Sequence, residues 1–130
     1  MAKLYRVILP VGDIEAASSF YSAVLESAGE RISPGRHYFD CGGTILACFD
    51  PVADGDQLGD GWKHHADQYI YFSVADLQSS LDRIQAAGGT IVDGGIQEMP
   101  WGERMFWDRD PFGNPISFVD ETTVFTGSSS

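Results

Sequence analysis

The chain has 130 residues, of which 43% are hydrophobic, so it is long enough for one domain and too apolar for wholesale disorder. Its 19 acidic residues against 8 lysines and arginines give a formal net charge of −11. A field of that sign repels phosphate backbones and argues against nucleic-acid binding, while it suits a cationic ligand or a solvated surface. The chain has no signal-peptide apolar region at its start and no run of the roughly 20 apolar residues that a membrane span needs. We therefore expect a cytoplasmic protein without a membrane partner.

The first half predicts a strand, a helix and three strands. A β-branched apolar run over Leu4–Val11 predicts a strand, and Asp13 after it is placed to cap a helix. From Ile14 onward apolar residues recur at three- and four-residue spacing, which predicts an amphipathic helix that ends at Ala28 and Gly29. Three strands are predicted next, at Arg31–Ser33, His37–Asp40 and Thr44–Phe49.

The second half repeats this order. Gln68–Val74 predicts a strand and Asp76 a helix cap. The apolar positions from Leu77 to Ala87 predict a helix, which Gly88 and Gly89 end. Further strands are predicted at Thr90–Val92, Arg104–Trp107 and Pro115–Val119.

Local matches indicate an internal duplication. Val11–Ile14 matches Val74–Leu77, 63 residues later. Two units of this size can share a core that neither has alone. We predict one domain over 1–130, with units at 4–50 and 68–121, a linker at 51–67 and a tail at 122–130. The later matches, 70 residues apart, join Asp40, Gly43, Leu46 and Asp50 to Asp110, Gly113, Ile116 and Asp120.

The two cysteines, Cys41 and Cys48, are too few for a disulfide framework. They are seven positions apart, and an odd spacing in a regular strand directs side chains to opposite faces. We predict two free thiols, as is usual in a reducing compartment.

The linker carries Asp54, Asp56 and Asp60, which have the oxygens that calcium prefers. The EF-hand spacing and its closing glutamate are missing, which favours a solvated loop or a flap over the sheet.

Three histidines are candidate metal ligands. His64 and His65 are adjacent, so they point apart in an extended segment, and His37 is alone in its strand. We predict exposed or structural roles for them, with a metal-ligand role as the alternative.

Two runs of motifs frame the repeats. The first is the strand–Gly–Asp–helix run with Phe20-Tyr21 and Val24-Leu25, and the second covers residues 100–104 (PWGER) and 108–115 (DRDPFGNP). Together they resemble the glyoxalase/bleomycin-resistance/dioxygenase (vicinal oxygen chelate) superfamily over residues 4–121. The resemblance implies an α+β fold in which two βαβββ repeats form a curved mixed sheet or half-barrel with helices outside. It also implies a homodimer, because relatives commonly pair.

The resemblance further implies where metal-dependent relatives hold their ion, with one ligand from the first and one from the last strand of each unit. In this sequence these positions are Arg6, Ala47, Tyr69 and Ser117. A guanidinium has no lone pair to offer, alanine has no donor, and neutral phenols and hydroxyls are poor ligands. We therefore expect no metal at the family site and no other cofactor.

Strand alternation predicts which side chains line the concave face. Arg6 shares a face with Leu4, Ile8 and Pro10, and Tyr69 shares one with Tyr71 and Ser73, while the alternate residues (Val7, Leu9, Val11, Ile70, Phe72 and Val74) pack beneath the helices.

The predicted concave face suits a flat or anionic small molecule. Its other members are Ser117 and nearby aromatics, for which Trp101, Phe106 and Trp107 are candidates. Arg6 would bind a carboxylate through two hydrogen bonds. In the alternative reading, Arg6 pairs with an internal carboxylate or a phenol.

The leading hypothesis is a metal-independent small-molecule-binding protein that sequesters or recognises its ligand in an aromatic-lined cavity. The alternative is a glyoxalase-like lyase, isomerase or dioxygenase with a relocated metal site, and a third possibility is a structural or regulatory dimer without a ligand. No catalytic residue is assigned, and Glu103 or Asp108 would act as a base only if the fold places it in the cavity. Trp101 and Arg104 either contact the ligand or only shape their hairpin. The candidate ligand-binding residues are Arg6, Tyr69, Tyr71, Trp101, Arg104 and Ser117.

Overall fold

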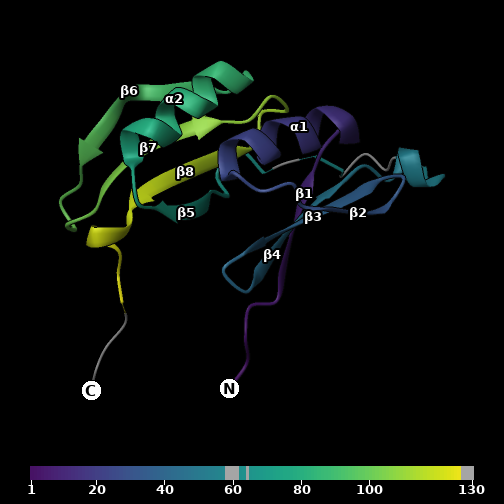
Figure 1. Cartoon of the computed structure of the whole chain (residues 1–130), viewed down its shortest axis with the longest axis horizontal. Helices are drawn as coiled ribbons and strands as arrows, with labels where there is room; N and C mark the ends of the chain where they lie inside the picture. Colours follow the sequence, from purple (N-terminus) through teal and green to yellow (C-terminus); the bar gives the residue numbers. More distant parts are fainter. Residues whose placement is uncertain (58–61, 64, 127–130) are drawn as a thin grey trace.

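The computed structural model describes residues 1–57, 62–63 and 65–126. It confirms the α+β class, with two four-stranded mixed sheets side by side and a helix over each (Figure 1). Asp60, His64 and residues 127–130, on which parts of the linker, histidine and tail predictions fall, lie outside the described residues. Neither described helix is long and apolar enough to cross a membrane.

The first unit has the strand order β1-β4-β3-β2, with β1 parallel to β4 and the other neighbours antiparallel. Its helix begins where sequence analysis placed it, because the Asp13 carboxylate accepts a hydrogen bond from the Ala16 N–H at 3.1 Å. The elements are β1 (Arg6–Pro10), α1 (Ile14–Leu25), β2 (Glu30–Ser33), β3 (Arg36–Cys41) and β4 (Thr44–Phe49).

The second unit repeats this topology, with the strand order β5-β8-β7-β6 and the same parallel and antiparallel pairings. The Asp76 carboxylate caps its helix by accepting from the Ser79 N–H at 3.0 Å. The elements are β5 (Ile70–Val74), α2 (Leu77–Ala87), β6 (Thr90–Glu98), β7 (Arg104–Arg109) and β8 (Pro115–Asp120).

The strand register confirms the duplication and corrects one match. Leu46 pairs with Val7, and Ile116 pairs with the equivalent Ile70, as the sequence match requires. On the neighbouring strand, however, Leu46 faces Phe39 whereas Ile116 faces Asp108. Phe39 is therefore the counterpart of Asp108, and the predicted match of Asp40 with Asp110 is wrong by one residue. Between the equivalent cross-strand pairs, Asp40–Ile45 and Arg109–Pro115, the chain has four residues in the first unit and five in the second.

Two element ends also differ from prediction. Helix α1 ends at Glu26, which adopts a left-handed conformation (φ 54°), and not at Ala28 and Gly29. Strand β6 continues to Glu98 and does not stop at Val92, because a bulge with positive φ at Asp93 and the two following glycines re-aligns it with β7.

The cysteine prediction was half right. Both thiols are free. They lie on the same face of the sheet and not on opposite faces, because Cys41 alternates with His37 on β3 while Cys48 on β4 faces His37 directly. The turn at Gly42 and Gly43 reverses the chain between them, so the seven-residue spacing does not run along one strand.

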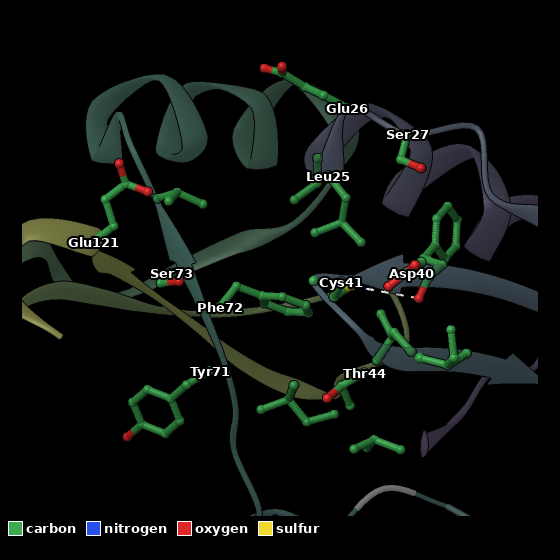
Figure 2. A pocket seen from close by; sticks show the side chains of 18 of the residues that line it. Leu25, Glu26, Ser27, Asp40, Cys41, Thr44, Tyr71, Phe72, Ser73 and Glu121 are labelled. Atoms are coloured by element: carbon green, nitrogen blue, oxygen red, sulfur yellow. Dashed lines mark hydrogen bonds between the residues drawn. The ribbon is translucent and has the colours of Figure 1, made fainter. Parts of the chain in front are cut away.

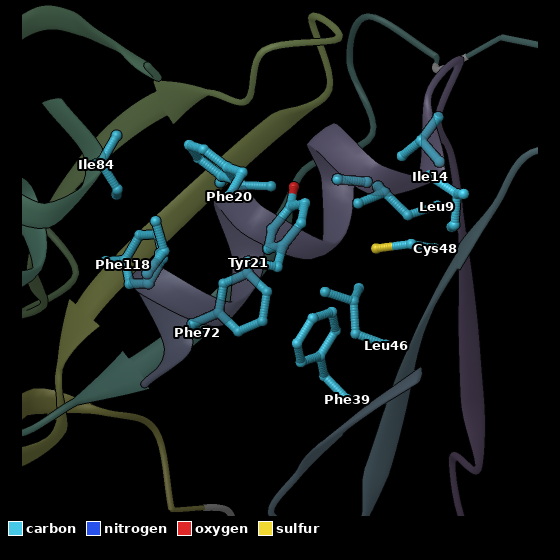
Figure 3. Packing of buried hydrophobic residues seen from close by; sticks show 14 of the residues in the cluster. Leu9, Ile14, Phe20, Tyr21, Phe39, Leu46, Cys48, Phe72, Ile84 and Phe118 are labelled. Carbon is cyan, nitrogen blue, oxygen red and sulfur yellow. The ribbon is translucent and has the colours of Figure 1, made fainter. Parts of the chain in front are cut away.

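The core fills the space between the helices and the helix-facing sides of both sheets (Figure 3). The predicted alternation is confirmed, since Leu9, Val11 and Phe72 are buried while Ile8 and Tyr71 are exposed. The placement of Phe106 near the concave face was wrong. Its ring stacks on Phe118, which in turn stacks on Phe72 in the core, with ring centres 5.4 and 5.1 Å apart.

A buried polar link, formed by Tyr21, Asp110, Asn114 and Pro10, joins the two units. The Tyr21 hydroxyl on α1 donates to Asp110 Oδ2 at 2.7 Å. Asn114 Nδ2 donates to the same oxygen at 2.8 Å and to the Pro10 carbonyl at the end of β1 at 2.9 Å. The turn between β7 and β8 is thereby attached to both the helix and the first strand of the other unit.

Candidate ligand site on the concave face

We call the side of each sheet that faces away from the helices its concave face. In the first unit this face has three rows of side chains, which run across β1, β4 and β3. Because paired residues point to the same side of a sheet, the register defines each row. The rows are Arg6, Ile45 and Asp40; Ile8, Ala47 and Tyr38; and Pro10, Phe49 and Arg36.

Two arginines converge on one phenol oxygen in this face. Arg6 Nη1 donates to Tyr38 Oη at 3.1 Å, and Arg36 Nη1 donates to the same oxygen at 3.0 Å. The Arg36 guanidinium also lies over the Phe49 ring, with its Cζ 3.9 Å from the ring centre. Arg6 thus has the phenol partner that sequence analysis left open as an alternative.

The concave face of the second unit carries aromatic and hydroxyl groups. The rings of Tyr69 and Tyr71 lie 6.4 Å apart, and Tyr71 is 51% exposed. Ser117 pairs with both Tyr71 and Trp107, so it lies on this face as expected. Its hydroxyl is fully buried and donates to the Phe106 carbonyl at 2.8 Å, which leaves it no second proton to offer a ligand.

Trp101 and Arg104 lie at the hairpin between β6 and β7, and each has a partner there. Trp101 is 62% exposed and its Nε1 donates to Glu103 at 2.7 Å. Arg104 Nη1 lies 3.6 Å from Asp120 Oδ2. On β7 it alternates with Met105, so it points away from the concave face. These contacts give both residues a structural role, and a role in ligand binding stays a prediction.

A gap of about 1030 Å³ separates the two sheets, below the end of α1 (Figure 2). Leu25 projects into it from the helix and Phe72 from β5, while Cys41 and Thr44 form the opposite wall. Tyr71 also borders the gap and points to the other side of β5 from Phe72. A space of this size is in the range of small-molecule sites.

Asp108 neither lines the gap nor lies on the concave face. It is fully buried on the helix-facing side of β7, opposite Ile91 and Ile116. Neither carboxylate oxygen has a hydrogen-bond partner among the described residues. Burial, and secondly the nearby charge of Asp110, raise its pKa to about 8. Its position gives no support to a role as a base in that cavity.

The thiols and the phenol of the polar link are poor acids in the folded protein. Burial raises the pKa of Cys48 to about 12 and raises that of Cys41 as well. Burial, followed by the charge and hydrogen bond of Asp110, raises the pKa of Tyr21 well above its ordinary value. These groups therefore stay protonated near neutral pH, and a protonated thiol or phenol is a weak nucleophile.

The residues at the four positions that the family resemblance implies as metal ligands have little to offer a divalent ion. Arg6 is a fixed cation, Ala47 has no donor atom, and the Ser117 hydroxyl is already bonded to a backbone carbonyl. Tyr69 and Ser117 supply only neutral oxygens, which are poor ligands for a divalent ion. Among residues 1–57, 62–63 and 65–126, no group of three or more His, Cys, Asp or Glu side chains is arranged to hold a metal.

The other candidate ligands have structural partners. His37 Nε2 lies 2.9 Å from the Ala28 carbonyl, and its Nδ1 accepts from Arg31 Nε at 3.2 Å. Both ring nitrogens are engaged, which confirms the structural role predicted for this histidine. Asp54 accepts from the Gly35 N–H at 2.7 Å and from the Ser33 hydroxyl at 2.8 Å, so it fastens the linker to the hairpin between β2 and β3.

Sequence reasoning missed Arg36, Tyr38 and Phe49 as members of the concave face. The signal was present, because Arg36 and Tyr38 alternate with the buried His37 and Phe39. The predicted strand began one residue late, at His37, and the alternation was not extended to it.

Comparison with known proteins identifies the family of the chain. It belongs to the Glyoxalase/Bleomycin resistance protein/Dioxygenase superfamily, whose sequence profile matches residues 3–118. This confirms the family resemblance. No curated protein matches the chain.

Solved structures show the same fold. A glyoxalase-related enzyme from Fulvimarina pelagi superposes with a TM-score of 0.79 at 18% identity, covering 100% of this chain and 96% of that one. A glyoxalase/bleomycin resistance protein from Albidiferax ferrireducens T118 gives 0.71 at 21%, covering 88% and 95%. A lactoylglutathione lyase from Agrobacterium tumefaciens gives 0.70 at 20%, covering 92% and 94%. At these identities the likeness concerns the fold.

Proposed function

We propose that the protein is a metal-independent small-molecule-binding member of the superfamily, which recognises or sequesters its ligand on the concave side of its sheets. The proposal is supported by the residue set Arg6, Ala47, Tyr69 and Ser117 at the four positions that the family resemblance implies for the ion of metal-dependent relatives. This set has one cation and one free phenol, which suit an organic ligand and not a divalent ion.

The shape of the molecule supports the proposal. The gap between the sheets has a volume of about 1030 Å³. Tyr69 and Tyr71 border it, while helix-facing side chains such as Val7, Leu46 and Phe72 form much of its wall. The exposed ring of Tyr71 and the half-buried ring of Tyr69 supply apolar contact area together with polar groups at the rim. We further propose that the protein acts as a homodimer in the cytoplasm.

Metal analysis of the purified protein tests the proposal. We expect only trace zinc, nickel, iron or manganese, and a melting temperature that a strong chelator leaves unchanged. Native mass spectrometry of the same preparation, compared with denatured protein, shows whether a small molecule co-purifies.

The opposite result would favour an enzyme. One tightly held metal ion per chain, whose removal abolishes a lyase, isomerase or dioxygenase activity, would contradict the proposal and indicate a relocated metal site. The names of the similar lactoylglutathione lyase and glyoxalase-related enzyme make such activities the first to assay.

A further inference from the structure

We infer that Arg6, Tyr38 and Arg36 form the binding site for the carboxylate of an organic anion with an apolar body. The inference deepens the function proposed above and rests on it, because both place a small molecule on the concave side of the sheets. It adds the chemical class of the ligand and the end of the site at which the charge lies.

The hydrogen bonds of Tyr38 give the first argument. Its oxygen accepts from Arg6 Nη1 at 3.1 Å and from Arg36 Nη1 at 3.0 Å. A phenol that accepts two hydrogen bonds still has its own O–H to donate, and no acceptor for it occurs among the residues that the structure describes. Two guanidinium groups and one hydroxyl therefore converge as donors, and an oxyanion is the group that satisfies all three.

The charge balance gives the second argument. The chain has 19 acidic residues and 8 basic ones. Of the four other arginines, Arg31, Arg83 and Arg104 each have a carboxylate partner, and Arg109 donates to the Gly113 carbonyl in its own turn. Arg6 and Arg36 form no ion pair with any described carboxylate, although they share one oxygen and their bonded nitrogens are at most about 6 Å apart. Two like charges at that distance repel each other, and a bound anion removes the repulsion.

Carboxylates are present on the same face, but they do not neutralise the pair. Asp40 lies in the row of Arg6, two strands away, and its Oδ1 accepts from the Gly43 N–H at 2.7 Å within its own turn. Glu30 lies opposite Tyr38 on the edge strand β2 and is exposed. Neither forms an ion pair with the two arginines, so the cations remain available to a ligand.

The surroundings show why an organic anion fits better than an inorganic one. The Phe49 ring lies beneath the Arg36 guanidinium, and Trp62 packs edge-on against Phe49 with ring centres 5.3 Å apart. Ile8, in the row of Tyr38, is 44% exposed. Apolar surface beside a pair of cations suits an aromatic or branched aliphatic carboxylate, whose body covers these side chains.

The second unit does not repeat the pair. By register, Tyr69 is the counterpart of Arg6, Trp107 that of Tyr38, and Met105 that of Arg36. Two copies of the same backbone thus present a charged and an aromatic surface, and the anionic end of the ligand belongs to the first.

An NMR titration of the full-length protein tests the inference with benzoate, its uncharged analogue benzamide and inorganic phosphate. We expect benzoate to shift the resonances of Arg36, Tyr38 and Ala47 in a saturable way at concentrations up to roughly 20 mM, which would saturate a ~1 mM site. Benzamide should bind at least about tenfold more weakly because it has no charge to pair with the arginines. Phosphate should likewise be weaker, because it leaves the apolar surface uncovered.

Variants with matched changes test whether benzoate binds at these residues. Arg36→Gln and Tyr38→Phe should each weaken benzoate binding roughly tenfold or more. Arg31→Gln removes the same charge from the neighbouring strand β2, on the opposite face, and should leave binding unchanged. Amide spectra of each variant establish that the fold is intact.

The outcomes separate this inference from the proposed function. Absence of saturable shifts with benzoate, equal binding of benzamide, or equal loss in Arg31→Gln would overturn the anion site. Benzoate shifts confined to Tyr69 and Tyr71 would also overturn it, while they would leave the proposed ligand-binding function standing. A stoichiometric metal ion would contradict the proposed function and would not change the titration result.

Discussion

The two units have the same strand pairing but fill equivalent positions with opposite chemistry. Phe39 in the first unit and Asp108 in the second occupy the same place beside β4 and β8, and both are fully buried. One unit places an aromatic ring there and the other a carboxyl group without a hydrogen-bond partner among the described residues. The two units therefore retain the same strand register while their buried side chains have diverged, and the unpaired polar group destabilises the second unit.

The turns before the last strands, β4 and β8, also differ in what their aspartates contact. Asp40 is exposed and holds only its own turn, through the Gly43 N–H. Asp110 is 4% exposed and accepts from Tyr21 and Asn114. The longer turn of the second unit thus serves both units, and the shorter one serves only itself.

Removing the aspartate from each turn should give the largest change in stability. Asp110→Ala should lower the free energy of unfolding by about 3–5 kcal/mol, since it leaves the buried Tyr21 hydroxyl and Asn114 amide without their acceptor. Asp40→Ala should cost less than about 1 kcal/mol, because it removes one exposed bond. Urea unfolding of both variants measures the difference, and equal losses would contradict it.

The second prediction concerns Asp108 and pH. The pKa of this carboxyl is raised from 3.8 to about 8 in the folded protein, so the folded protein keeps a proton that the unfolded chain has lost. The stability that the protonated Asp108 provides is complete below pH 4 and is lost as the pH rises to about 8. The free energy of unfolding falls by at most ~1.4 kcal/mol per pH unit over this range. Asp108→Asn should therefore raise stability by roughly 2 kcal/mol or more at pH 8 and change little at pH 4.

Chemical unfolding at several pH values measures this effect. The wild-type protein should lose stability between pH 5 and 8, and the variant should show a flatter profile. Identical pH profiles for the two proteins would show that Asp108 is ionised in the folded state.

The helix caps are a place where the two units should behave alike. Asp13 and Asp76 each accept a backbone hydrogen bond from the third residue after them, at 3.1 and 3.0 Å. Asp13→Ala and Asp76→Ala should each lower the melting temperature by roughly 3–6 °C. Calorimetry of the two variants checks this, and a difference of more than a factor of two would show that the caps are not equivalent.

The smallest effect concerns the helix ends. Glu26 ends α1 in a left-handed conformation with φ 54°, whereas Gly88 takes the same role after α2. Glu26→Gly should raise stability by about 0.5–1 kcal/mol, because relief of the strained backbone outweighs the exposed ion pair with Arg83. Glu26→Ala, which loses the ion pair and keeps the strain, should be no more stable than the wild type by thermal unfolding.

Much of the fold was predictable because alternation and helical spacing are strong local signals. Strand Thr44–Phe49 and the starts of both helices agree with the structure. What failed depends on features that leave no such signal. Nothing in the sequence indicates that Glu26 adopts the left-handed conformation that ends α1. The glycines after Asp93 suggested the end of a strand, but a bulge there lets the strand continue.

The candidate site was less predictable, because it depends on cross-strand partners. Alternation along the first strand of each unit placed Arg6 and Tyr71 correctly on the concave face. It could not show that Arg36, from a strand two places away in the sheet, reaches the same phenol as Arg6. That convergence is a property of sheet register, which a single sequence does not display.

The Tyr21–Asp110–Asn114–Pro10 link has a consequence for how the protein unfolds. Helices α1 and α2 contact each other, and the link adds buried hydrogen bonds across the same boundary. If one half opened, buried polar groups of the other half would lose their hydrogen-bond partners in an apolar interior. A partly unfolded state is therefore high in free energy. The duplicated chain should therefore melt in one all-or-none transition, with amide exchange in both halves slowed by the same global barrier.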